Sequence, residues 1–327
     1  MEQFKALVVK EADETVVHGI EEISLENLHE GDVVVKVAYS SLNYKDMLAV
    51  QPKGGVIRKY PMIPGIDLSG TVVSSEDDRF SQGQEVLVTG YDLGVSHTGG
   101  LSEYARVKAD WLVPLPAGLS LKDVMIFGTA GFTAAQSVYA LEAHGLADNK
   151  DARILITGAT GGVGSVALQI LAKNGYTNIS ALVRKDYQVE VAKKLGAHHV
   201  IFSEELGEKR LLGRAVYDYV LDTVGGEVAA TLIPQITDNG SISMCGNAAG
   251  AKLDTNVLPF ILRGVNILGI NSVTETHENR LILWNKMANE WNITADALSQ
   301  EVSLDEVPSI LADLKAGKHL GRTIVKL

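Results

Sequence analysis

The chain has 327 residues, more than one hydrophobic core usually organises, so two domains are expected. Its formal net charge of −11 argues against the basic surface of a nucleic-acid-binding protein. The one cysteine, Cys245, excludes an intramolecular disulfide and favours a reducing, cytoplasmic setting. We expect no membrane partner, because no apolar run of spanning length and no signal-peptide pattern stand out.

The first 120 residues are typical of a β-rich domain. Short apolar and β-branched runs are separated by turn-forming pairs, including Pro64-Gly65 and Gly99-Gly100. These runs predict strands over residues 4–9, 33–38, 68–73, 85–88 and 104–107.

From about residue 125 the pattern changes to helical segments that alternate with short apolar runs. This alternation predicts an α/β domain with a doubly wound parallel sheet. The six expected strands cover residues 154–157, 179–183, 200–202, 217–221, 241–245 and 265–270.

The last sixty residues contain a helical stretch near 280–291 and end in an apolar run, 321–327, that predicts a strand. We expect this final strand to return to the β-rich domain. The first domain should then cover residues 1–123, completed by about 300–327, and the second should cover 124–299.

A glycine-rich turn follows the first strand of the α/β part, where residues 154–164 read ILITGATGGVG. A strand, tight turn and helix of this kind bind a dinucleotide pyrophosphate through backbone N–H groups at the helix N-terminus. Ala159 stands where the first glycine of G-x-G-x-x-G is usual, so a plain βαβ crossover is the alternative. The residues expected to line the pyrophosphate are Thr160, Gly161, Gly162 and Val163.

The end of the next strand indicates which nicotinamide cofactor would bind. An NAD site usually has a carboxylate there for the ribose 2′-OH, but this chain has Arg184 and Lys185. A guanidinium can hold a 2′-phosphate through two hydrogen bonds, so the sequence predicts NADPH. The alternative is that both cations are only solvated loop residues.

Other candidate cofactor contacts lie near strand ends, where ligands bind in open α/β sheets. Thr133 should reach the nicotinamide, or it serves only to satisfy backbone groups at a helix start. Cys245 is expected to be a small buried hydrophobe rather than a nucleophile, because no histidine partner is evident. The further candidates are Leu182, Tyr187, Ser203, Cys245, Asn247 and Ile270.

Several segments, in this order, resemble the medium-chain dehydrogenase/reductase superfamily over the whole chain. They are residues 41–46 (SLNYKD), 64–70 (PGIDLSG), 99–104 (GGLSEY), 131–134 (GFTA) and the glycine turn. The resemblance implies a GroES-like substrate domain, a Rossmann domain and a cleft between them. Zinc alcohol dehydrogenases of this superfamily bind catalytic zinc through a cysteine and a histidine where this chain has Asn43 and Ile66, so no metal is expected.

More narrowly, the chain resembles the zinc-free quinone oxidoreductases of the acryloyl-CoA reductase type, on residues 43–46, Arg184 and Gly321-Arg322. The resemblance implies NADPH-dependent reduction of an α,β-unsaturated acyl-CoA, such as acryloyl-CoA to propionyl-CoA. Reduction of a quinone or enone is one alternative. A non-catalytic NADPH-binding protein is an alternative of another class.

Three residues of the resembling segments have expected roles. Tyr44 could protonate the enolate carbon or hydrogen-bond the acyl oxygen, or it could only pack on the cofactor. Asn43 could donate to the carbonyl oxygen in place of zinc, or it could be a turn amide. The resemblance places Arg322 at the cofactor, with a surface cation as the alternative. The candidate contacts for CoA phosphates are Lys53, Arg58, Lys59 and Arg263.

A small-molecule substrate and a second copy of the chain are the expected partners. The last strand of the parallel sheet, 265–270, is an apolar edge strand, which can pair with its twin in a homodimer.

Overall fold

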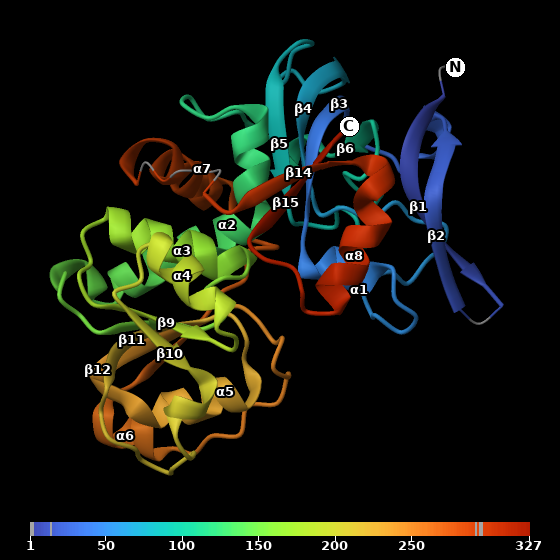
Figure 1. The fold of residues 1–327 in the computed structure, drawn as a ribbon. Helices are drawn as coiled ribbons and strands as arrows, with labels where there is room; N and C mark the ends of the chain where they lie inside the picture. Colours follow the sequence, from blue (N-terminus) through green and yellow to red (C-terminus); the bar gives the residue numbers. More distant parts are fainter. Residues whose placement is uncertain (1–2, 14, 292, 294–296) are drawn as a thin grey trace. The chain divides into compact units, whose positions relative to one another are not determined.

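The computed structural model describes residues 3–13, 15–291, 293 and 297–327. The chain forms two compact units. Figure 1 shows the helices and strands as a ribbon coloured along the sequence. Unit 1 comprises Met1–Thr129, Ser272–Glu290 and Ala295–Leu327, and unit 2 comprises Ala130–Asn271 and Trp291–Thr294.

Unit 1 is built on a seven-stranded sheet with the order β14-β15-β3-β4-β5-β7, in which β6 also pairs with β3. All of its pairings are antiparallel except that of β14 with β15. The strands are β3 (Val33–Leu42), β4 (Asp67–Ser75), β5 (Glu85–Thr89), β6 (Tyr104–Val107), β7 (Val113–Pro114), β14 (Ser299–Ser303) and β15 (Arg322–Lys326). The expected return of the C-terminal strand is confirmed, because β15 pairs with β3.

A separate antiparallel pair, β1 (Phe4–Ala12) with β2 (Thr15–Ile23), completes the strands of unit 1. Strand β2 is not among the strands predicted from the sequence. Its side chains are all exposed or only partly buried, so it lacks the buried alternation by which strands are recognised. Helices α1 (Tyr44–Ala49) and α8 (Val307–Lys315) pack against each other in the same unit.

Unit 2 contains a six-stranded, all-parallel sheet with the order β10-β9-β8-β11-β12-β13. The strand order reverses between β8 and β11, and ligands of doubly wound sheets bind at such a switch point. The strands are β8 (Ile154–Ile156), β9 (Ile179–Val183), β10 (His199–Phe202), β11 (Tyr217–Asp222), β12 (Ile236–Met244) and β13 (Asn266–Gly269). The predicted doubly wound sheet is therefore confirmed.

Helices flank this sheet, because right-handed crossovers return the chain to the next parallel strand. Helix α3 packs on β8 and β9, α4 on β9 and β10, and α6 on β12. The helices of unit 2 that follow β8 are α3 (Gly162–Lys173), α4 (Tyr187–Lys194), α5 (Gly226–Leu232) and α6 (Leu258–Arg263). Between them lies an apolar core that includes Leu155, Val220 and Ile242, all fully buried.

Helix α2 (Leu121–Ala143) runs from unit 1 into unit 2 and is kinked at Gly128, whose φ is +52°. It is long and apolar enough to cross a membrane, a run that the sequence analysis did not expect. However, 83% of its most apolar window is buried within the protein, as is common for a core helix. It therefore gives little support to a membrane span.

The units differ from the expected domain boundaries over Ser272–Glu290, which packs with unit 1. This segment contains α7 (His277–Asn285) and a π-helical turn over Lys286–Glu290. The buried Arg280 explains its placement. Its guanidinium donates to Thr89 at the end of β5 and to the backbone oxygens of Ser272 and Val273, and it lies over the Tyr91 ring.

Candidate active site and cofactor site

A tight turn follows β8, as the sequence predicts, but the glycine that makes it is one position earlier than in the usual pattern. Gly158, one residue before the usual first glycine, has φ +57° and makes the tight turn. A Cβ on Gly164 would lie 2.4 Å from the Gly158 carbonyl oxygen. Helix α3 can therefore lie this close to the turn only because residue 164 is glycine. Ala159 is fully buried and causes no clash in this arrangement.

The N-terminus of α3 is open to a ligand. Its N-cap is Gly161, which has no side chain to satisfy the first N–H groups of the helix. The adjacent Gly162 and Val163 are only partly buried, whereas Gly164 is buried. These residues fit a pyrophosphate, since exposed backbone donors and the helix dipole both favour an anion.

Beside this turn, Gln188 organises the end of β9. Its Oε1 accepts from the backbone N–H groups of Arg184 (2.9 Å) and Lys185 (3.1 Å), and its Nε2 donates to Thr160 Oγ1 at 2.7 Å. Gln188 is not among the residues predicted from the sequence. The exposed Arg184 side chain makes no hydrogen bond or ion pair with any other residue that the structure describes, so it is available for a 2′-phosphate. Tyr187 is 49% exposed, with the Lys185 ammonium 5.9 Å from its ring centre.

Five further predicted cofactor residues lie in unit 2, whereas Tyr44 and Arg322 lie in unit 1. Thr133 is buried in α2, Leu182 is buried in β9, and Ser203 follows β10 and donates to the Val183 carbonyl oxygen. Asn247 is exposed after β12, and the Ile270 N–H donates to the Met244 carbonyl oxygen. Their contacts with a cofactor stay predictions.

Cys245 follows β12 and is partly buried. Removal from water, and next the charge of Asp222, raise the pKa of its thiol to about 12. A thiol with that pKa is almost entirely protonated at neutral pH, and only the thiolate is a nucleophile. The thiol is therefore not activated as a nucleophile, while the expected role of Cys245 as a small buried hydrophobe stays a prediction.

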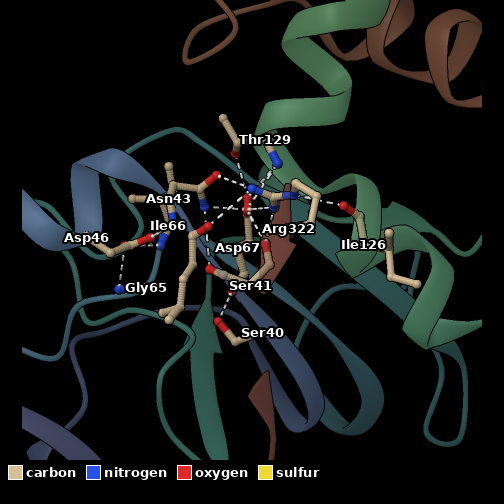
Figure 2. A network of polar contacts seen from close by, with 11 residues as sticks. Ser40, Ser41, Asn43, Asp46, Gly65, Ile66, Asp67, Ile126, Thr129 and Arg322 are labelled. Carbon is tan, nitrogen blue, oxygen red and sulfur yellow. Dashed lines mark hydrogen bonds and ion pairs between the residues drawn. The ribbon is translucent and has the colours of Figure 1, made fainter. Parts of the chain in front are cut away.

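In unit 1, a polar network surrounds Asp67, the first residue of β4 (Figure 2). The carboxylate is fully buried and accepts hydrogen bonds from Ser41 Oγ (2.6 Å) and Asn43 Nδ2 (2.7 Å). It also accepts from the Thr129 N–H at 3.0 Å and from the Thr129 hydroxyl. Segments from β3, β4 and α2 are thus joined at one carboxylate.

Arg322, the first residue of β15, neutralises this carboxylate and is 3% exposed. Its Nη2 lies 3.9 Å from Asp67 Oδ2 and donates to Ser41 Oγ at 2.9 Å. Its Nη1 donates to Leu42 O and Asn43 Oδ1, and its Nε donates to Ile126 O. The expected cofactor contact is not supported, because the guanidinium is buried and used within unit 1.

Asn43 also differs from its expected role. Its Nδ2 donates to Asp67 and, at 3.4 Å, to the Ser41 carbonyl oxygen, while its Oδ1 accepts from Arg322. The amide therefore has no free donor for a substrate carbonyl in this structure. Its backbone N–H donates to Asp46 Oδ2 at 2.8 Å, which caps the start of α1.

Asp46 is a second buried carboxyl group near Asp67, and it holds the loop before β4. Its Oδ1 accepts from the N–H groups of Gly65 and Ile66, both at 3.1 Å. Burial, and next the Asp67 charge, raise the pKa of Asp46 to about 7.

Tyr44 is the first residue of α1, and it follows directly on the anchored Asn43. Its side chain is 48% exposed, and its hydroxyl forms no hydrogen bond among the described residues. Its backbone position is fixed while its phenol is free to meet a ligand.

Among the candidate CoA contacts, Arg263 has a structural role instead. Its guanidinium donates to the backbone oxygens of Gly213, Pro234 and Ile236, which joins α6 to the ends of neighbouring segments. The other three, Lys53, Arg58 and Lys59, are exposed and stay predictions.

Comparison with known proteins shows the family to which this chain belongs. The Bacillus subtilis protein YhfP, named as a quinone oxidoreductase, is 46% identical over 99% of both chains. The acrylyl-CoA reductase AcuI of Ruegeria pomeroyi is 42% identical over 98% of both. The chain belongs to the medium-chain dehydrogenase/reductase superfamily, in the group that contains these two enzymes. The resemblance noted from its motifs is confirmed.

Family models and solved structures agree with this membership. Residues 29–117 match the alcohol dehydrogenase GroES-like domain, and residues 162–288 match the zinc-binding dehydrogenase family. The structure of the Salmonella enterica yhdH oxidoreductase in complex with NADP has a TM-score of 0.95, with 41% identity and 99% of both chains covered. That of B. subtilis yhfP, with NAD bound, has a TM-score of 0.96, with 44% identity and full coverage of both.

Because residues 162–288 match a family described as zinc-binding, the residues at the zinc-ligand positions of this chain matter. Asn43 is committed to Asp67 and Arg322, and Ile66 is buried and apolar. Within the described residues, no group of three or more histidine, cysteine, aspartate or glutamate side chains could hold a metal ion.

Proposed function

We propose that this reductase transfers a hydride from NADPH to an activated carbon–carbon double bond without a metal, and that its substrate is an α,β-unsaturated acyl-CoA such as acryloyl-CoA. The polar centre around Asp67 is the main support for a metal-free reaction. At the two positions where zinc alcohol dehydrogenases bind their metal, Asn43 is hydrogen-bonded to Asp67 and Arg322, and Ile66 is buried and apolar. The full-length similarity to an acrylyl-CoA reductase supports the substrate class.

The substrate class follows from how negative charge is stabilised. Alcohol oxidation passes through an alkoxide, which needs a Lewis acid or an equivalent cation beside it. Reduction of an enoyl thioester instead spreads the charge over an enolate. The described residues offer no metal-ligand group for the first reaction, whereas the second requires only hydrogen-bond donors and a proton source.

For the cofactor, the residues present fit NADPH. The open N-terminus of α3 would hold the pyrophosphate, and Arg184 would hold the 2′-phosphate. When bound, NADPH supplies the hydride that adds to the β-carbon of the acyl group.

The direct test measures NADPH oxidation side by side with acryloyl-CoA, crotonyl-CoA and a benzoquinone. We expect kcat/KM to be highest with an enoyl-CoA and activity to survive prolonged treatment with EDTA. A preference for the quinone would favour the quinone or enone alternative. NADPH binding without turnover of any acceptor would favour the non-catalytic alternative, and loss of activity with EDTA and rescue by zinc would contradict the metal-free mechanism.

Cofactor choice should depend on Arg184, whose side chain is exposed at the end of β9. Arg184→Ala removes a charge-assisted contact of about 1.5–3 kcal/mol. The KM for NADPH should rise about tenfold or more, while the KM for NADH changes little.

Lys185→Ala is the matched control, because it removes the neighbouring exposed cation from the same loop. Its effect on the KM for NADPH should be smaller than that of Arg184→Ala. Equal losses for NADPH and NADH in the Arg184 variant would refute the assignment of this residue to the 2′-phosphate.

We also propose that the protein is a cytoplasmic homodimer. Strand β13 ends the parallel sheet and leaves one edge open, and apolar side chains are exposed on and near it. These are Ile261 and Leu262 of α6, which directly precedes β13, and Ile267 of β13 itself, and they are 40–69% exposed. Such a patch favours pairing with a second copy.

Light scattering should therefore give the mass of a dimer. Ile261→Glu with Leu262→Glu should shift the protein towards a monomer, because the substitutions place charge on the apolar patch. A monomer mass for the wild-type chain at all concentrations would contradict the dimer.

A further inference from the structure

Three loops of unit 2 meet at the switch point of the parallel sheet, around Asp222 and Thr223. Strand β11 ends at Asp222, between β8 and β12. Across the sheet, Leu221 pairs with Ile156 of β8, and Asp222 pairs with Met244 of β12. The residues just beyond these pairs are the glycine turn after β8 and the loop that begins at Cys245.

Asp222 is fully buried, and its carboxylate binds groups from two of these loops. Oδ1 accepts from Thr157 Oγ1 at 2.8 Å, and Oδ2 accepts from the Gly225 N–H at 2.8 Å. Its backbone oxygen accepts from the N–H of Cys245 at 3.0 Å, which adds the third loop. No basic side chain forms an ion pair with it in the part of the chain that the structure describes, so hydrogen-bond donors alone stabilise the carboxylate.

Thr157 and Thr223 bind each other reciprocally. Thr157 Oγ1 accepts from the Thr223 N–H at 2.8 Å, and Thr223 Oγ1 donates to the Thr157 carbonyl oxygen at 2.8 Å. The Thr157 hydroxyl therefore both donates to Asp222 and accepts from Thr223. A hydroxyl can do both at once, whereas an aliphatic side chain can do neither.

Glycines from the neighbouring loops pack directly on this group. A Cβ on Gly158 would lie 2.4 Å from Thr223 Oγ1, and one on Gly246 would lie 1.9 Å from the Thr223 carbonyl oxygen. A Cβ on Gly225 would lie 2.7 Å from the Gly246 carbonyl oxygen. The loops therefore contact one another through their backbones, and a shift of one must displace the others.

We propose that Asp222, Thr157 and Thr223 are positioning residues for the nicotinamide cofactor. They hold the turn that begins at Gly158, and with it the open N-terminus of α3, in the shape that receives a pyrophosphate. The same residues fix the backbone conformation of the loop 224–226 and of the start of the loop at Cys245. This inference rests on the proposed use of NADPH, and it assigns a role to the buried Asp222 and Thr157 and to the partly buried Thr223, none of which the sequence pattern singles out.

The test compares Thr157→Val with Thr157→Ser. Valine matches threonine in shape but removes the hydroxyl, which leaves Asp222 Oδ1 and the Thr223 N–H without their short hydrogen bonds. Serine keeps the hydroxyl and is the matched control. The affinity for NADPH, measured by cofactor fluorescence without any acceptor present, should fall about tenfold for Thr157→Val, or about 1.4 kcal/mol. Thr157→Ser should stay within about threefold of the wild type.

Cys245 gives a second readout that needs no cofactor. It is the one cysteine of the chain, and its Sγ and N–H both lie against the Asp222 carbonyl oxygen. If the loops loosen, its reaction with a thiol reagent in the absence of NADPH should be faster in Thr157→Val than in Thr157→Ser or the wild type. At saturating NADPH, kcat should change less than the KM for NADPH.

The two proposals fail in different ways. A wild-type protein that does not bind NADPH would refute the proposed function. Wild-type affinity and wild-type thiol reactivity in folded Thr157→Val would overturn the positioning role, as would equal losses in Thr157→Val and Thr157→Ser. If Thr157→Val does not fold, Thr223→Val against Thr223→Ser applies the same comparison to the second hydroxyl.

Discussion

Replacing Arg322 by methionine should lower the free energy of unfolding by about 3–5 kcal/mol, the range for removing one partner of a buried ion pair. Methionine fills much of the volume but leaves the fully buried Asp67 without its cation. The backbone oxygens of Leu42 and Ile126 also lose their donors. Urea unfolding followed by circular dichroism measures the loss.

Two further variants separate charge from geometry at this site. Arg322→Lys keeps the positive charge but cannot reproduce the planar set of donors, so its loss should be intermediate. Arg58→Met is the surface control, because Arg58 is exposed in the same unit, and it should change stability by less than about 0.5 kcal/mol. A loss below about 1 kcal/mol for Arg322→Met would show that Asp67 does not depend on this cation.

The fold was predictable because its signal is local and repeated. Each strand of the parallel sheet is a short apolar run between helical segments, and the observed order β10-β9-β8-β11-β12-β13 is the doubly wound order expected for such alternation. Strand β2 carries no such signal, because none of its residues is buried. Likewise, the packing of Ser272–Glu290 with unit 1 depends on the buried Arg280, whose partners near Thr89 are almost two hundred residues away in sequence.

For the candidate site, the sequence indicates the residue types better than their orientations. Arg322 looked like a cofactor contact and Asn43 like a substrate contact, but both side chains turn towards Asp67. That choice depends on the meeting of β3, β4, α2 and β15, which no local pattern encodes. Gln188 was missed for the same reason, since only the folded turn brings it to Thr160. One local signal was readable: Gly158, next to Ala159, could have been recognised as the glycine that makes the turn.

Tyr44→Phe should lower kcat on acryloyl-CoA by about 10²-fold or more, the lower end for loss of a general acid, if the phenol is the proton donor. After the β-carbon is reduced, the enolate must take a proton at its α-carbon. A tyrosine hydroxyl carries its proton at neutral pH and can donate it. The Tyr44 hydroxyl is suited to this step, because it has no hydrogen-bond partner among the described residues and its side chain is half exposed.

Phenylalanine keeps the ring, so the substitution separates the hydroxyl from packing on the cofactor. The anchored start of α1 should keep that ring in place, since Asn43 and Asp46 fix the backbone through their own hydrogen bonds. Tyr104→Phe removes a hydroxyl elsewhere in unit 1 and should leave kcat unchanged. Quinone reduction should suffer less than acryloyl-CoA reduction in Tyr44→Phe, because its protons go to oxygen and can come from water. An unchanged kcat with acryloyl-CoA, where chemistry is shown to limit the rate, would make Tyr44 a packing residue and water the proton donor.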